Sequence, residues 1–375
     1  MTLDINYHGV KPEEEIEEEL PDFTEVDPDF SLEEIDEDFE NLVVIGNGGS
    51  ITSLRALYYT FMEEAEKHLD IVSTMDPDRL EQVLSHTDTE DTLVMPISKS
   101  GSTIGVLEVL MFFVNRGYDF TPLTTPGSPL HEIAKRYDRK IIEHQEVGGR
   151  FSGLTNTALA PAELIGLDTG EIRKGGEEGY QELREDAVET ASVLYQAEKD
   201  GYQEVLTPFY SSRMFGYYPL LVQLMHETVC KEGEGQTFYG DHAPEYQHHT
   251  NQRLFGGRKD LIPFFFRTEH RETSIEVPDE ISEIEVKGRN FGELDGESLV
   301  DALNAEFSGV REALRDEDMP YIDLKLEDSG YRGFGKLMAF MQLLAYYSAE
   351  IRGVDPLTQP DVEKSKKMGL EARFR

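Results

Sequence analysis

Cysteine is almost absent from this chain of 375 residues, in which Cys230 stands alone. One cysteine excludes both an intramolecular disulfide and a zinc site built on cysteine ligands. Long hydrophobic runs are absent too, because the longest, at residues 104–114, contains Glu108 and is far shorter than the ~20 residues of a membrane span. The first residues also lack the basic and apolar stretches of a secretory signal. We therefore expect a soluble, cytoplasmic protein without a membrane partner.

Basic residues are scarce as well. Lysine and arginine together number 35 against 75 aspartates and glutamates, which gives a formal net charge of −40. A field this negative repels phosphate backbones and argues against a nucleic-acid partner. The acidic residues occur in almost every segment rather than in one block. This distribution favours a surface adapted to a very salty cytoplasm, such as that of a halophilic archaeon, over an acidic tail or a calcium-binding surface.

The order of the segments indicates the α/β class. Residues 41–46 are predicted to form a buried strand that leads through a Gly-Gly-Ser turn, capped by Ser50, into a helix reaching Leu69. Residues 92–98 repeat this plan, and their helix, which ends at Val114, is apolar nearly all round and so expected to be buried. Further strands are predicted at residues 120–124 and 140–144. Such alternation predicts a parallel sheet with helices on both faces.

The pattern divides the chain into five parts. A first α/β unit at 41–167 and a second at 202–353 are joined by a polar helical connector at 168–201. The second unit is clearest in its predicted helices at 217–229 and 334–351 and its strands at 261–266 and 321–326. Residues 1–40 are predicted to be an acidic arm that lies on the surface or is partly disordered, since 11–40 hold 16 acidic residues and one lysine. Residues 354–375 are predicted to end in a helix.

Two turns between a strand and a helix are typical of an anion site. Gly49 and Ser50 lie in the first, where glycine lets the backbone approach a ligand and the helix start favours negative charge. The second turn has four hydroxyls and one lysine within six positions: Ser98, Lys99, Ser100, Ser102 and Thr103. Helix capping alone accounts for only one of these hydroxyls, so we predict that the two turns bind a phosphate monoester. The absence of a GxxxxGK[ST] pattern excludes a nucleotide P-loop.

Two further segments carry a resemblance. Residues 147–152 (VGGRFS), followed by GLTNTALA, closely resemble the first signature of the glucose-6-phosphate isomerases, and residues 359–366 (QPDVEKSK) resemble the second. The two small-residue turns lie where the sugar-isomerase (SIS) fold of that family has its phosphate-binding turns. The resemblance covers most of the chain from residue 41 onward. It implies two SIS-type three-layer α/β/α subdomains, and interconversion of glucose 6-phosphate and fructose 6-phosphate without cofactor or metal.

The resemblance also implies individual roles. Glu232, in KEGEG, matches the family's catalytic base, and His248, in QHHTNQ, matches its ring-opening histidine. Lys366 matches its C-terminal lysine, Arg150 is expected to face the developing oxyanion, and Gln359 to reach the sugar. The neighbours Glu234 and His249 remain rivals for the first two roles. Because family members are dimers in which the histidine reaches the neighbouring subunit's site, we also expect a homodimer.

The residue types suit this chemistry on their own terms. Moving a proton between C2 and C1 through an enediolate requires a carboxylate and a nearby cation, which Glu232 and Arg150 supply. Ring opening requires a second acid–base pair, for which His248 and Lys366 are suited.

Three other interpretations stay open. One is a SIS-type regulator that binds a sugar phosphate without converting it, and another is an isomerase that also accepts mannose 6-phosphate. A metal site is the third, made by Asp241 with His242, His248 and His249, although no HExxH pattern is present.

Overall fold

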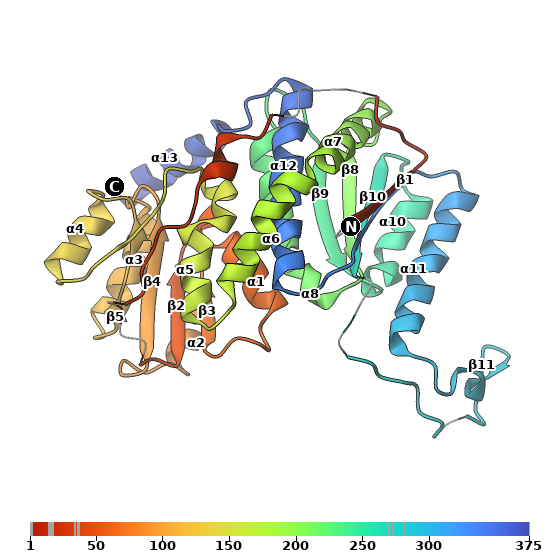
Figure 1. Cartoon of the computed structure of the whole chain (residues 1–375), viewed down its shortest axis with the longest axis horizontal. Coiled ribbons are helices and arrows are strands. Elements are labelled where there is room, and N and C mark those ends of the chain that lie inside the picture. The colour runs from red at the N-terminus through yellow and green to blue at the C-terminus, as the bar shows by residue number, and fades with distance from the viewer. Residues whose placement is uncertain are drawn as a thin grey trace.

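Two α/β halves lie side by side in the computed structural model, each around its own sheet, with α6 (Thr169–Glu182) and α12 (Tyr331–Arg352) between them (Figure 1). The structure describes residues 3–13, 19–33, 35, 38–268, 271, 273–280 and 282–374. Parts of the predicted acidic arm, at 1–2, 14–18, 34 and 36–37, lie outside the described residues. Within the described ranges, none of the helices has the length and apolar character to cross a membrane.

The first sheet is entirely parallel, in the order β3-β2-β4-β6-β7, with β5 also paired to β4. Its strands are β2 (Asn41–Ile45), β3 (His68–Val72), β4 (Thr92–Ser98), β5 (Asp119–Phe120), β6 (Leu123–Thr124) and β7 (Ile142–Glu143). Its helices are α1 (Thr52–Thr60), α2 (Pro77–Leu84), α3 (Ile104–Val114), α4 (Pro129–Arg136) and α5 (Asn156–Leu164). All of β4 and nearly all of β2 are buried, as apolar strands covered on both faces must be. The predicted parallel sheet is confirmed.

The second sheet repeats this topology. Its parallel strands, in the order β9-β8-β10-β13, are β8 (Glu204–Phe209), β9 (Thr237–His242), β10 (Leu261–Thr268) and β13 (Tyr321–Leu326). Numbered along the chain, with β1 and the short β5 left out, each sheet begins 2-1-3-4. The strand order therefore reverses between β2 and β4 in one half and between β8 and β10 in the other. Ligands of open α/β sheets bind beyond the carboxyl ends of the strands at this switch point.

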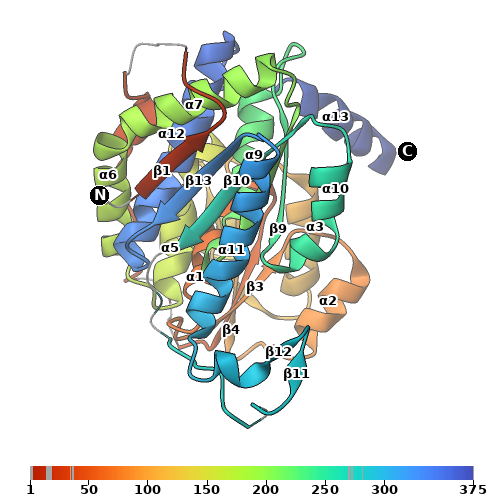
Figure 2. The same ribbon diagram turned by 90° about the vertical axis from the view of Figure 1, so that its right-hand side faces the viewer.

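The remaining elements cover and join the sheets. The helices are α7 (Arg184–Lys199), α8 (Ser212–Phe215), α9 (Tyr218–Val229), α10 (Thr250–Gly256), α11 (Leu299–Asp316) and α13 (Asp361–Arg373). Short 3-10 turns are η1 (Asp22–Glu25), η2 (Gly48–Ser50), η3 (Gly149–Leu154), η4 (Glu245–His248) and η5 (Phe291–Leu294). A hairpin of β11 (Glu285–Val286) and β12 (Arg289–Asn290) projects below α11 (Figure 2). The core is densest around α12, which packs on α6, α7 and α9.

The predicted helix that was to run to Leu69 is too long. It ends at Thr60, and Leu69 lies instead in β3, which pairs in parallel with β2. The spacing of Phe61 and Leu69 fits a helix by coincidence, and pairing along β2 overrides it. Ser50 is not the helix cap either, since it lies in η2 and Ile51 occupies that position.

Two further local predictions were wrong. Helix α3 is not buried all round, because Glu108 and Met111 are exposed on its outer side. The strand predicted at 120–124 is split into β5 and β6, with Pro122 between them, because proline has no N–H to donate to a ladder.

The acidic arm does more than cover the surface. Leu3–His8 form β1, an antiparallel edge strand on β13 that the sequence analysis did not predict. Phe23 is buried and stacks on Phe151 with ring centroids 4.4 Å apart. Both contacts attach the arm to the folded body.

Candidate active site

The two glycine motifs meet backbone to backbone. Gly49, in η2 after β2, lies so close to η3 that a β-carbon on it would stand 2.2 Å from the carbonyl carbon of Gly149 and 2.4 Å from the nitrogen of Arg150. Gly48 has φ +55°, a left-handed conformation that glycine adopts without strain. Glycine at position 49 is thus what allows the first sheet to present both turns at one place.

Arg150 is buried between the halves, with 3% of its surface exposed. Its Nε donates to Thr228 Oγ1 at 2.8 Å and its Nη1 to Gln359 Oε1 at 2.6 Å. Its Nη2 donates to the carbonyl oxygens of Pro356 at 2.5 Å and Thr358 at 3.3 Å. These contacts use four of the five N–H groups of a guanidinium, and one on Nη1 remains. The fold therefore brings Arg150 and Gln359 together across 209 positions of sequence.

Helix α9 supplies polar groups to this place that the sequence analysis missed. Glu227 Oε2 lies 3.7 Å from Arg150 Nη1, and Glu227 Oε1 accepts from Gln223 Nε2 at 3.1 Å. Gln223 in turn accepts from Thr52 on α1 at 2.8 Å. Burial lowers the pKa of Arg150, and the carboxylates of Glu227 and Asp355 partly offset this effect. The available signal was the group of polar residues Gln223, His226, Glu227 and Thr228 on a helix that is otherwise largely apolar.

The predicted base, Glu232, follows α9 in an exposed turn. It has φ +56°, a conformation that costs a non-glycine residue of order 1 kcal/mol or more and that often marks functional sites. Lys231, just before it, is buried, and its Nζ donates to the carbonyls of Thr228 at 2.8 Å and of Asp355. Burial, and then the charge of Arg150, lower the pKa of Lys231. The anchored lysine immediately precedes Glu232 in the chain, and the rival Glu234 is exposed in the same turn.

The serine turn at 98–103 contacts the segment that leads into Arg150. Lys99 Nζ donates to the carbonyl oxygen of Val147 at 3.2 Å and lies 3.5 Å from the carboxylate of Glu146, so this turn is tied to the segment that carries Arg150. Ser98 Oγ is buried against Thr103 Oγ1 at 2.9 Å. Ser100 and Ser102 are exposed and hydrogen-bonded to each other at 2.9 Å. A phosphate at this turn would meet exposed hydroxyls and one ammonium.

His248 does not join this group. It is exposed in η4, which follows β9, whereas Glu232 precedes β9. Since a strand rises ~3.3 Å per residue, the five steps of β9 separate its two ends by about 16 Å. The rival His249 is likewise exposed and lies 3.5 Å from Asp241.

Lys366 also points elsewhere. Its side chain on α13 is 64% exposed and pairs with Glu363 at 2.8 Å. Helix α13 has no buried residue among those described, and Arg373 at its end pairs with Glu108 of α3. Of the two residues that the resemblance singles out in this C-terminal segment, Gln359 contacts Arg150 and Lys366 does not.

The three histidines weighed as metal ligands do not form a ligand group in the part of the chain that the structure describes. The group close enough to share an ion there is His68, Asp70 and His86, whose ligand atoms lie within 4.8 Å of one another. Arg79 already donates to Asp70 at 2.6 Å, which makes this group an ion-pair cluster at the edge strand β3.

Comparison with known proteins gives the arrangement a context. No protein-family model matches the chain. The probable glucose-6-phosphate isomerase of Natronomonas pharaonis is 29% identical over 359 residues, covering 92% of this chain and 82% of its own length. The glucose-6-phosphate isomerase of Rubrobacter xylanophilus is 27% identical over 88% of this chain and 81% of its own.

The chain is similar to glucose-6-phosphate isomerases. Among solved structures, hypothetical protein TT0462 from Thermus thermophilus superposes with a TM-score of 0.81 at 26% identity, covering 89% of this chain and 84% of that one. A glucose-6-phosphate isomerase from Chlamydia trachomatis gives a TM-score of 0.75 at 22% identity, over 90% and 70% of the two chains. The latter establishes a common fold. The two-sheet SIS-type architecture expected from the sequence is therefore confirmed.

Proposed function

We propose that this chain is a glucose-6-phosphate isomerase, which interconverts glucose 6-phosphate and fructose 6-phosphate through an enediolate in glycolysis and gluconeogenesis. Curated relatives of that name, matched over most of the chain, support the isomerase and do not favour a non-catalytic regulator. The observation that carries the proposal is the buried Arg150, held by Thr228 and Gln359 where the two glycine turns meet.

The substrate's phosphate is proposed to bind at the serine turn. Ser100, Ser102 and Thr103 donate hydroxyl hydrogen bonds, Lys99 adds a positive charge, and Gly49 and Ser50 of η2 complete the proposed site. Because Lys99 is tied to Val147, the sugar extends from this turn toward Arg150. The remaining N–H on Nη1 is available to the oxygens on which negative charge develops.

Glu232 is the proposed proton carrier. Its exposed side chain lies in the turn anchored by Lys231. Its left-handed backbone is strained, and such strain is typical of residues held in position at active sites. Glu227 is proposed to position Arg150 and Gln223 and not to take the proton. Replacing each glutamate separately distinguishes the role of Glu232 from that of Glu227.

Ring opening is proposed to use His248 and Lys366. Since His248 lies at the far end of β9 from Glu232, we infer that it serves the site of a second copy, in a homodimer with two shared sites. Lys366 would have to leave Glu363 and turn toward the sugar.

Subunit complementation tests this shared site. Inactive His248→Ala chains are mixed with inactive Glu232→Gln chains under conditions that exchange subunits. If histidine crosses the interface, each heterodimer has one site with both defects and one with neither, so activity returns. Persistent inactivity despite demonstrated exchange rules out the shared site.

A coupled assay tests the function itself. Purified protein is given fructose 6-phosphate or mannose 6-phosphate in molar potassium chloride, with and without a chelator. Turnover of fructose 6-phosphate that is insensitive to the chelator supports the metal-free proposal, whereas mannose 6-phosphate turnover would show the bifunctional alternative. We further propose that the enzyme works in the cytoplasm and that its acidic surface is an adaptation to molar salt.

A further inference from the structure

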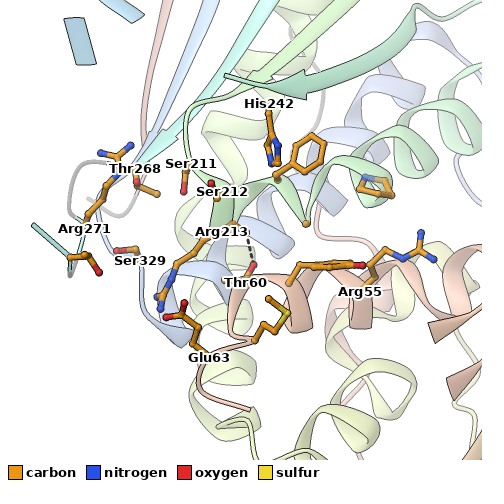
Figure 3. A pocket seen from close by; sticks show the side chains of 16 residues that line it. Arg55, Thr60, Glu63, Ser211, Ser212, Arg213, His242, Thr268, Arg271 and Ser329 are labelled. Atoms are coloured by element: carbon orange, nitrogen blue, oxygen red, sulfur yellow. Dashed lines mark hydrogen bonds between the residues drawn. The ribbon is translucent and has the colours of Figure 1, made fainter. Parts of the chain in front are cut away.

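A second switch point lies in the half of the molecule that the catalytic proposal does not use. There, the segments after β8, β9, β10 and β13 surround a cavity of about 850 Å³, closed on its other side by α1 (Figure 3). Its place beyond β8 and β10 corresponds to that of the catalytic turns beyond β2 and β4. This volume is within the ~300–1,000 Å³ of small-molecule sites.

The charge of this cavity opposes that of the chain. Three arginines line it, Arg55, Arg213 and Arg271, against one glutamate, Glu63. The whole chain has more than twice as many acidic as basic residues, so an excess of arginine at one cavity indicates a role for positive charge there. Arg213 is paired with Glu64 at 2.6 Å, which leaves the cavity's net charge positive. A cavity of this kind attracts anions.

Two polar groups in its wall lack partners. Thr268, at the end of β10, is 4% exposed, and its Oγ1 has no hydrogen-bond partner among the described residues. Arg271 donates through Nη2 to the carbonyl oxygen of Tyr210 at 2.7 Å, while its buried Nη1 has no partner there either. Buried donors are rarely left unsatisfied in native proteins, and such exceptions call for a ligand or water.

The polar groups gather at one end of the cavity. Ser211 and Ser212 lie beside Thr268 and Arg271, whereas Arg55 lies on the opposite side (Figure 3). Tyr59, Met62 and Phe215 contribute apolar surface to the lining, and the first two are about half exposed. The lining thus offers hydroxyl and guanidinium donors to an oxyanion and an apolar surface to the group attached to it.

We propose that this cavity is a second phosphate-monoester site, distinct from the catalytic turns. The phosphate accepts hydrogen bonds from Ser211, Ser212, Thr268 and Arg271, and the organic part lies against Tyr59 and Met62. The same strand order thus provides each half of the molecule with one site for a phosphorylated metabolite.

Equilibrium dialysis of the full chain against radiolabelled inorganic phosphate tests the proposal. We expect two phosphates per wild-type chain and one for the Thr268→Val/Arg271→Gln variant, whose affinity at the second site falls at least about tenfold. Isomerase turnover of this variant should equal that of the wild type, which also reports that it folds. The Ser100→Ala/Ser102→Ala variant should lose the other phosphate and keep this one.

A matched control removes similar groups elsewhere. Thr157 is a buried threonine whose Oγ1 also lacks a partner among the described residues, and Arg116 is an exposed arginine. Thr157→Val/Arg116→Gln should retain both phosphates. If the double variant at the cavity does not fold, Arg271→Gln alone takes its place with the same expected loss. The proposal is overturned if the cavity variant binds as many phosphates per chain as the wild type, whether that number is one or two.

Discussion

At the residue scale, the site depends on a contact that leaves no room for a β-carbon. Gly49→Ala would place one 2.2 Å from the backbone of Gly149. We expect the substitution to destabilise the fold by about 1–3 kcal/mol and to lower kcat/KM at least about tenfold, because η3 and Arg150 must shift. Gly148→Ala is the control, since its β-carbon would meet nothing nearer than Phe151 at 3.9 Å. Thermal melts and steady-state kinetics of both variants check this, and equal behaviour would contradict it.

The roles of Glu232 and Glu227 are distinguished by replacing each with glutamine, which keeps the shape and removes the charge. Glu232→Gln keeps the shape and removes the base, so kcat should fall by ~10²–10⁴-fold while the substrate still binds. Glu227→Gln should cost less and act mainly by loosening Arg150. Glu234→Gln is the control and should leave kcat near the wild-type value. Near-normal turnover of Glu232→Gln would transfer the proton-carrying role to one of the other two.

His144 predicts a pH dependence of stability. It is buried, and burial is the main cause that lowers its pKa. The contact of its Nδ1 with the carbonyl oxygen of Gln145 at 2.8 Å opposes this effect, as does Glu146, while Lys99 adds to it. The unfolded chain therefore takes up a proton near pH 6.5 that the folded chain does not. Stability is full above this pH and falls as the pH drops toward the folded-state pKa.

His144→Gln isolates this effect, because it removes the titrating group while keeping a polar side chain. The melting temperature of the wild type should fall more steeply than that of the variant between pH 7.5 and pH 5. Parallel curves for the two proteins would show that His144 does not carry the dependence.

At the element scale, β1 protects the edge of the second sheet. It pairs with all six residues of β13, a strand that is almost wholly buried. Deleting residues 1–8 would leave the backbone of β13 as an unpaired edge, so we expect a melting temperature lower by several degrees and concentration-dependent aggregation. Deleting only residues 1–2 is the control. Melts and light scattering check this, and a stable, monodisperse truncation would show that β1 contributes little.

The elements that the sequence predicted well are those with strong internal signals. The apolar run of β4 and the long apolar stretch of α12 predict burial from their own residues, whichever elements pack against them. Two of the elements that it missed, β1 and β3, are edge strands whose identity depends on their pairing partners. Their mixed composition is equally compatible with a helix or an extended arm. Pairing with a neighbouring strand of the sheet is what makes them strands.

At the scale of the whole molecule, the net charge of −40 makes the stability of the folded chain depend on salt. Lowering the salt from 1 M to 0.1 M lengthens the screening distance from ~3 Å to ~10 Å, so the carboxylates repel one another over a larger range. We expect loss of activity and a lower melting temperature in dilute buffer, both reversed by potassium chloride. Circular dichroism melts across this range check it, and a constant melting temperature would refute the salt-adapted surface.

The candidate site shows which relations the sequence contained. Its motifs named Arg150 and Gln359, but only the folded chain shows their contact across 209 positions. The contacts of Arg150 with Thr228 and Glu227 likewise depend on the packing of α9. The cavity beyond β8 and β10 had no motif at all, because its donors come from separate strand ends. When the fold brings together side chains from distant segments, their spacing in the sequence forms no recognisable motif.

Proton transfer itself is the most direct test of the central claim. Fructose 6-phosphate is incubated with the protein in molar potassium chloride made up in D₂O, and the hexose phosphates are followed by proton NMR. An enediolate mechanism predicts glucose 6-phosphate with deuterium at C2 for at least part of the product, and no exchange with Glu232→Gln. If the wild-type chain binds fructose 6-phosphate yet neither isomerises it nor exchanges its C1 proton, the protein is not this isomerase.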